Sequence, residues 1–173
     1  MTLPTPPAPP PNSRLLQGFR SFAVTAVWVV LGLMLVASLS GGLALPSQAP
    51  PLQATDLQGK QVDLAQLRGQ PVVLYFWASW CTACKLTSPT VASFARRHPE
   101  VRVLGVAMED ADAARAYLGQ ALPPYAVLVE NPAIRQAYPV RALPTTVVID
   151  RGGKVAWSRQ GVLLPGELDL RLP

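Results

Sequence analysis

The sequence predicts an α/β domain built on a central mixed β-sheet with helices on both faces. Apolar runs at 72–78, 101–106 and 125–129, rich in β-branched and aromatic residues, are typical of buried strands, and stretches with helical character separate them. Near the C-terminus, the turn Asp-Arg-Gly-Gly at 150–153 joins two further strand-like runs and favours a hairpin. Strands that alternate with helices and end in a hairpin indicate both parallel and antiparallel pairing in one sheet.

The predicted elements follow one another closely along the chain. Two short strands at 53–56 and 60–63 form an N-terminal β extension, and a helical turn at 64–67 leads into the central strand. Acidic residues open the helix at 110–118, and Asn131 followed by Pro132 is a favourable N-cap and N1 pair for the helix that runs to 138. The full predicted series is strand 72–78, helix 81–98, strand 101–106, helix 110–118, strand 125–129, helix 131–138, and strands 145–149 and 155–158.

A long uncharged segment precedes this domain. No charged residue lies between Arg20 and Asp56, and residues 21–39 are apolar enough for a helix of about 28 Å, close to the hydrocarbon thickness of a bilayer. Basic residues precede this span, and none follows until Lys60, which predicts a cytoplasmic N-terminus and a domain across the membrane. We therefore expect a disordered, proline-rich cytoplasmic tail at 1–20, a transmembrane anchor at 21–45, a linker at 46–51 and the folded domain at 52–173. A cleaved signal peptide is the alternative to an uncleaved anchor.

Charge excludes one class of function. The net charge is +5, and the basic residues are dispersed without a basic run, so nucleic-acid binding is not expected.

The only two cysteines, Cys81 and Cys84, follow the central strand directly, at the predicted start of the next helix. Unpaired N–H groups and the helix dipole stabilise a thiolate at Cys81, so its pKa is expected to fall, whereas Cys84 is expected to be more buried and to resolve a mixed disulfide. A structural disulfide across so short a loop constrains little of the unfolded chain. A zinc site needs about four ligands, and the two cysteines with His98, the only histidine, cannot complete one. We expect His98 to serve instead as a cation at the end of the helix.

Two further cysteine chemistries lack their neighbouring residues. Haem attachment requires His after the second cysteine, where the chain has Lys85, and a peroxidatic cysteine ordinarily follows Thr or Ser at the position of Ala78. Reversible thiol–disulfide exchange is the chemistry that these residues favour.

Two segments carry a family resemblance. VVLYFWASWCTACKLTSP resembles the active-site strand and helix of thioredoxin-fold proteins, and YPVRALPTTVVIDRGGKV resembles their cis-proline loop and closing hairpin. With ATDLQGKQVDLAQLRGQ and the anchor, the chain looks like the membrane-tethered TlpA/ResA/DsbE branch. The resemblance implies a thioredoxin fold, catalytic roles for Cys81 and Cys84, a cis peptide bond at Pro144 facing the dithiol, and substrate contacts from Trp80, Leu143, Pro144 and Thr145.

Three positions depart from the family pattern. Thioredoxins carry a buried Asp at the position of Tyr75, many ResA/DsbE-like proteins carry Glu at Thr87, and the cytochrome c maturation branch often has Glu at Thr145. These departures bring the chain closer to the suppressor-of-copper-sensitivity D-like group. The segment at 165–171 is also shorter than the usual last helix of the family, so one face of the sheet is expected to be thinly covered.

The resulting prediction is a thiol–disulfide oxidoreductase of the bacterial inner membrane, single-pass, with its domain in the periplasm and no cofactor beyond its own disulfide. Its expected partners are extracytoplasmic protein thiols and disulfides and a membrane redox protein. Three alternatives remain: a Cu(I)-binding dithiol module, a reductant of apocytochrome c, and a redox-inert scaffold.

Overall fold

The computed structural model describes residues 26–32 and 45–173, which fall in two compact units that divide between Ser40 and Gly41. Residues 26–32 are helical, and their large apolar side chains, such as Trp28, are exposed. The predicted tail at 1–20 and most of the predicted anchor lie outside the described residues. Within the described residues, no helix combines the length and the apolar character needed to cross a membrane.

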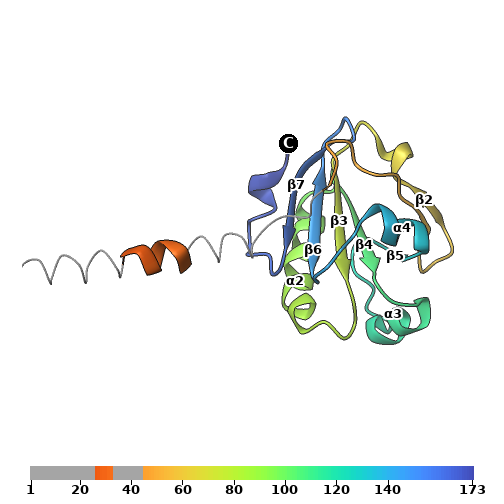
Figure 1. The fold of residues 1–173 in the computed structure, drawn as a ribbon. Coiled ribbons are helices and arrows are strands. Elements are labelled where there is room, and N and C mark those ends of the chain that lie inside the picture. Colours follow the sequence, from red (N-terminus) through yellow and green to blue (C-terminus); the bar gives the residue numbers. More distant parts are fainter. Residues whose placement is uncertain (1–25, 33–44) are drawn as a thin grey trace, which may run out of the picture. The chain divides into compact units, whose positions relative to one another are not determined.

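The second unit is built on a five-stranded mixed sheet with the strand order β5-β4-β3-β6-β7 (Figure 1). Strands β3, β4 and β5 run parallel, whereas β6 pairs antiparallel with both β3 and β7. The strands are β3 (Val72–Trp77), β4 (Arg102–Ala107), β5 (Ala126–Val129), β6 (Thr145–Ile149) and β7 (Val155–Gln160). The predicted mixed sheet is confirmed.

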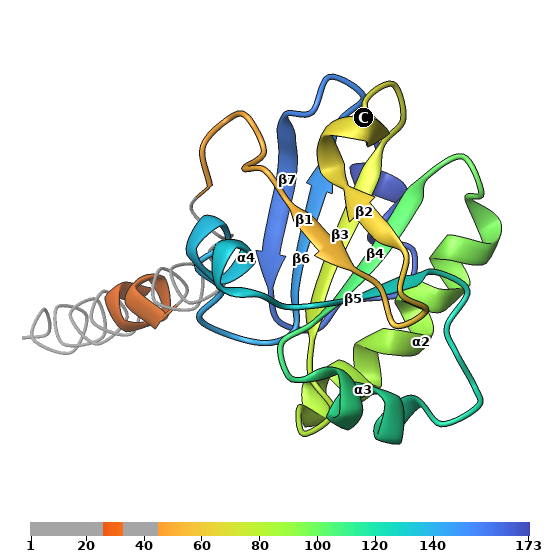
Figure 2. The ribbon, with the colours of Figure 1, turned by 90° about the vertical axis from the view of Figure 1, so that its right-hand side faces the viewer.

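Helices and an N-terminal extension cover the two faces of this sheet (Figure 2). The helices are α2 (Thr82–Arg97), α3 (Ala111–Leu118) and α4 (Pro132–Ala137), and two short 3₁₀ helices span Leu64–Leu67 and Asp169–Arg171. The extension is a separate antiparallel pair of β1 (Gln53–Thr55) and β2 (Gln61–Asp63), as predicted.

Each face has its own apolar core because side chains of successive residues in a strand point to opposite faces. Along β3, Tyr75 and Trp77 pack with α2 and α3, whereas Leu74 and Phe76 pack with α4 and the N-terminal extension. All six residues of β3 are buried, which explains its continuous apolar sequence.

The segments before β1 and after β7 make more contacts with the domain than the sequence suggests. On the α2 face, Leu163 and Leu168 are buried in the core, so the short C-terminal segment covers that face without a full helix. In the expected linker, the Ala49 N–H donates to the Gly153 carbonyl at 3.0 Å, and the Ser47 carbonyl accepts from the Val155 N–H at 2.9 Å. The segment at 46–51 is therefore bound in part to the β6–β7 turn.

Candidate active site

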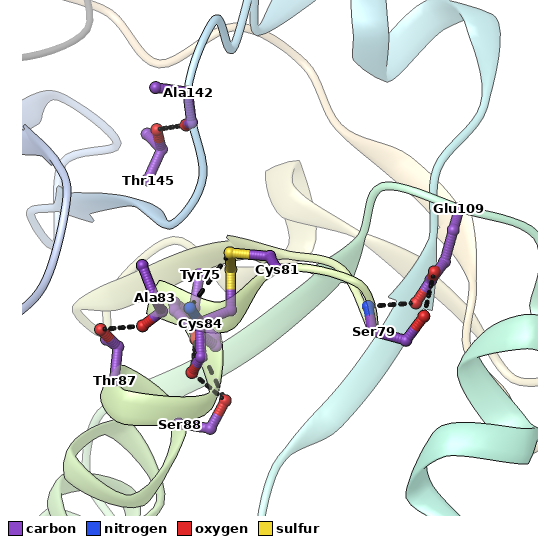
Figure 3. Close-up of a disulfide and its surroundings, with 10 residues drawn as sticks. All are labelled: Tyr75, Ser79, Cys81, Ala83, Cys84, Thr87, Ser88, Glu109, Ala142 and Thr145. Atoms are coloured by element: carbon purple, nitrogen blue, oxygen red, sulfur yellow. Dashed lines mark hydrogen bonds between the residues drawn. A yellow bond between two sulfur atoms is a disulfide. The ribbon is translucent and has the colours of Figure 1, made fainter.

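The two cysteines form a disulfide where β3 hands over to α2 (Figure 3). The sulfur–sulfur distance is 2.09 Å, and the two Cα atoms lie 5.2 Å apart. Cys81 is the N-cap of α2, and its sulfur accepts a hydrogen bond of 3.1 Å from the Cys84 N–H. Cys81 retains 7% of its accessible surface and Cys84 only 1%, so Cys84 is the more buried of the two, as predicted.

The start of α2 holds Cys81 in a favourable place for a negative charge. The first N–H groups of a helix have no partner within the helix, and its dipole is positive at this end. No acidic residue lies in the first turn of α2. The thiolate form of Cys81 is therefore stabilised by backbone groups that the fold supplies.

Two hydroxyl groups lie beneath the dithiol in place of a carboxylate. Tyr75 is fully buried, and its hydroxyl lies 3.0 Å from the Cys84 carbonyl oxygen and 3.1 Å from the Ser88 hydroxyl, which itself lies 2.9 Å from that carbonyl (Figure 3). Burial raises the pKa of Tyr75 to about 12, because it disfavours the charged phenolate. Tyr75 therefore stays protonated at neutral pH and acts as a hydrogen-bond donor.

Strand register brings the proline loop to the edge of the sheet that carries the cysteines. Phe76 pairs with Thr145 across the antiparallel β3–β6 ladder. Pro144, the residue before Thr145, therefore lies at the end of the ladder where β3 leads into Cys81. The Leu143–Pro144 peptide bond is cis, the isomer that the resemblance implies. No described residue forms a hydrogen bond with the backbone of Leu143.

A groove of about 430 Å³ lies against Trp80, the residue that precedes Cys81. It is lined by Trp80, Met108, Val140, Arg141, Ala142 and Leu143. Trp80 is 68% exposed and forms one wall, and the loop before Pro144 forms the other. Trp80 and Leu143, both predicted from the sequence, therefore meet in one groove.

Two positions singled out from the sequence point inward. The Thr145 hydroxyl donates to the Ala142 carbonyl at 2.6 Å, and Thr145 is fully buried, so only its backbone could contact a substrate. Thr87 is also fully buried, and its hydroxyl donates to the Ala83 carbonyl within α2 at 3.1 Å. Neither side chain is presented to the groove.

Sequence reasoning missed Ser79 and Glu109. The Glu109 carboxylate accepts one hydrogen bond from the Ser79 N–H at 2.8 Å and another from the Ser79 hydroxyl at 2.7 Å. Ser79 directly precedes Trp80, so this contact lies within the active-site loop. It depends on strand pairing between segments 30 residues apart, which no local motif reveals.

Residues 46–158 match the AhpC/TSA family. The chain belongs to this family. It is 36% identical over 130 residues to the thiol:disulfide interchange protein DsbE of Xylella fastidiosa, an alignment that covers 73% of this chain and 64% of that protein. It is 30% identical over 117 residues to the thiol-disulfide oxidoreductase ResA of Bacillus thuringiensis, covering 65% of this chain and 68% of ResA.

Solved structures agree with this family assignment. A secreted disulfide oxidoreductase of Mycobacterium tuberculosis, described as homologous to E. coli DsbE, superposes with a TM-score of 0.62 at 27% identity, over 69% of this chain and 92% of that one. The fold is therefore thioredoxin-like. Membership of the suppressor-of-copper-sensitivity D-like group stays a prediction.

Proposed function

We propose that this chain is a thiol–disulfide oxidoreductase that exchanges disulfides with protein substrates through Cys81 and Cys84. The observation that carries the proposal is the disulfide at the start of α2, in which Cys81 is the more exposed residue, with the cis-Pro144 loop at the same edge of the sheet. The relatives named DsbE and ResA support the same activity.

Electrons move in pairs between the substrate and the dithiol. When the pair is oxidised, a substrate thiolate attacks the Cys81 sulfur, the Cys81–Cys84 bond breaks, and Cys84 leaves as a thiolate that takes up a proton. A second substrate thiol then loses its proton, attacks the substrate sulfur of the mixed disulfide and displaces Cys81. The substrate has then lost two electrons to the pair, which is left as a Cys81 thiolate and a protonated Cys84, and the reverse sequence reduces a substrate disulfide.

The surroundings of the dithiol support this cycle. The Cys84 N–H and the helix dipole stabilise Cys81 both as attacking and as leaving thiolate. An extended substrate can lie in the groove between Trp80 and Leu143 and pair with the free backbone of Leu143. That position holds a substrate sulfur next to Cys81.

The same proposal includes a membrane tether. The charge-free segment between Arg20 and Asp56 and the basic residues before it support an anchor at 21–45 that leaves the domain in the periplasm of a bacterium. A membrane redox protein would then supply or remove the electrons. Fusions of a periplasm-dependent reporter to residue 45 and to residue 173 are expected to be active; inactive fusions would contradict the proposed topology.

The test of the exchange chemistry is capture of substrates by Cys84→Ala. Without the resolving sulfur, this variant is expected to accumulate mixed disulfides through Cys81, and the wild type is expected to reduce insulin in the presence of dithiothreitol. Cys81→Ala is the matched control and should capture nothing. Absence of mixed disulfides in Cys84→Ala, together with tight Cu(I) binding by the reduced wild type, would favour the copper-binding alternative instead.

A further inference from the structure

The carboxylate of Glu109 and the active-site turn meet because of strand register. In the parallel β3–β4 ladder, Trp77 pairs with Ala107, and the Met108 N–H continues the ladder by donating to the Trp77 carbonyl at 2.8 Å. Ser79 lies two residues after Trp77, and Glu109 lies two residues after Ala107. The ladder therefore places the carboxylate beside Ser79, the first residue after the buried run at 72–78.

The turn that Glu109 contacts delivers Cys81 to the helix. The Cys81 N–H donates to the Ala78 carbonyl at 3.2 Å, which closes a turn with Ser79 and Trp80 at its centre. Glu109 accepts both the N–H and the hydroxyl of Ser79, one on each carboxylate oxygen (Figure 3). Hydrogen bonds to an ionised acceptor are the stronger kind, so this contact fixes the turn at two points.

The residues on either side of this contact line the groove. Trp80, next to Ser79, and Met108, next to Glu109, are both among the lining residues. Trp80 is largely exposed, so few contacts of its own side chain hold it in place. The turn sets the position of its backbone, and Glu109 binds that turn at Ser79.

We propose that Glu109 is a positioning residue for substrate binding, which acts through Ser79 to hold Trp80 as a fixed wall of the groove. This inference rests on the proposed exchange activity and extends it to the recognition of extended protein substrates. A small disulfide that does not fill the groove gains nothing from a fixed wall. The role is therefore visible as a difference between large and small substrates.

Steady-state kinetics with the full-length chain test this role. Insulin is the protein substrate, and 2-hydroxyethyl disulfide is the small one, chosen because it is neutral and so insensitive to the charge removed. In Glu109→Ala we expect the KM for insulin to rise about fivefold to tenfold, the size of effect that one lost charge-assisted contact can produce. Turnover of 2-hydroxyethyl disulfide should change less than about twofold, because its reaction needs only Cys81 and Cys84.

Companion variants separate positioning from general stability. Ser79→Ala keeps the backbone bond and loses the hydroxyl bond, so its KM should lie between those of the wild type and Glu109→Ala. Combining Ser79→Ala with Glu109→Ala should add nothing further, because both act through one contact. Asp112→Asn is the matched control: it removes a carboxylate from the first turn of α3 whose side chain is 96% exposed, and it should behave as the wild type.

Three results would overturn the inference. One is a KM for insulin in Glu109→Ala that equals that of Asp112→Asn. Another is an equal loss toward both substrates, and the third is full additivity of the two substitutions. If Glu109→Ala does not fold, Glu109→Gln and Ser79→Ala give the same comparison.

Amide hydrogen exchange at residues 78–81 tests the contact without any turnover. Exchange at Ser79 should be faster in Glu109→Ala than in Asp112→Asn, and equal exchange would reject the contact. The two proposals can therefore fail separately. A wild type that is inactive toward both substrates contradicts the proposed function, whereas amide hydrogen exchange tests the contact between Glu109 and Ser79 without any turnover.

Discussion

The two ends of α2 differ in what their polar groups contact. At the N-terminal end, Cys81 caps the helix with its sulfur, and the buried hydroxyls of Tyr75 and Ser88 surround the Cys84 carbonyl. At the C-terminal end, His98 caps the helix and contacts the Asp169 carboxylate at 2.8 Å and the Glu100 carboxylate at 3.0 Å.

The N-terminal end of α2 thus carries the reactive groups, whereas its C-terminal end stabilises the fold, which we call the bracing end. The helix dipole favours an anion at its start and cations at its end. The end follows that rule with Arg96 and Arg97 in the last turn, and the start offers the same stabilisation to a Cys81 thiolate once the disulfide opens. The start carries the disulfide, and no acidic residue lies in the first turn of α2 to oppose a thiolate there. The end uses Arg97 and His98 to bind Asp169, 71 residues or more away in sequence, and so ties the C-terminal segment to the domain.

The largest expected effect is a loss of insulin reduction on substitution at the reactive, N-terminal end of α2. Cys81→Ser should lower insulin reduction at least about a thousandfold, because an oxygen at this position cannot form the exchangeable disulfide. His98→Ala, at the other end of the same helix, should keep nearly full turnover. Measurable exchange in Cys81→Ser, or its loss in His98→Ala, would contradict the division of roles.

A smaller effect is expected at the hydroxyl pair. Tyr75→Phe removes a buried donor to the Cys84 carbonyl but leaves Ser88 in place, so we expect a loss of about 1 kcal/mol in the free energy of unfolding. Chemical denaturation of the oxidised chain measures this loss. Tyr117→Phe, at a tyrosine that is exposed, should cost much less. Equal stability of the two variants would show that the buried hydroxyl contributes nothing.

The bracing end should respond in stability alone. Asp169→Asn weakens the contacts with Arg97 and His98, which are partly exposed, so the free energy of unfolding should fall by up to about 1 kcal/mol. Insulin reduction should be unchanged. A drop in turnover without a drop in stability would mean that the two ends of α2 are coupled.

The smallest effect is the pH dependence of this bracing. Hydrogen bonds that the His98 ring donates to Asp169 and then to Glu100 raise the pKa of His98 above its ordinary value of 6.5, and the contact with His98, followed by Arg97, lowers the pKa of Asp169 below 3.8. The His98 contribution is complete below pH 6.5 and is lost as the pH rises through the raised value; the Asp169 contribution is present above 3.8 and is lost as the pH falls through the lowered value.

The stability difference between the wild type and His98→Ala should therefore be largest between about pH 4 and 6.5 and shrink as the pH rises through the raised pKa of His98. Thermal unfolding across this range measures it. A difference that grows with pH would reverse the expected sign.

Much of the fold follows from local patterns. The buried strand before Cys81, the N-cap role of Asn131 and the acidic start of α3 were all predictable, because strand burial and helix capping depend on neighbouring residues. The cis bond before Pro144 came from resemblance to a family rather than from the residues themselves.

The contacts that the sequence did not reveal join distant segments. Glu109 reaches Ser79 only because β3 and β4 pair in one particular register, and a shift of that register would separate them. Asp169 reaches His98 only because the C-terminal segment packs across the α2 face. Neither pair has a local signal, since the carboxylates alone look like ordinary solvated side chains.

The sequence by itself determined the chemistry available to this protein: two cysteines at the end of a buried strand, placed where a helix begins and stabilises a thiolate. The tertiary structure decided which groups surround that dithiol, namely the hydroxyls beneath it, the groove against Trp80 and the carboxylate that binds its turn. The reason is physical. Helix dipoles and strand burial act over a few residues, whereas hydrogen bonds across a sheet need both register and packing to bring their partners within 3 Å.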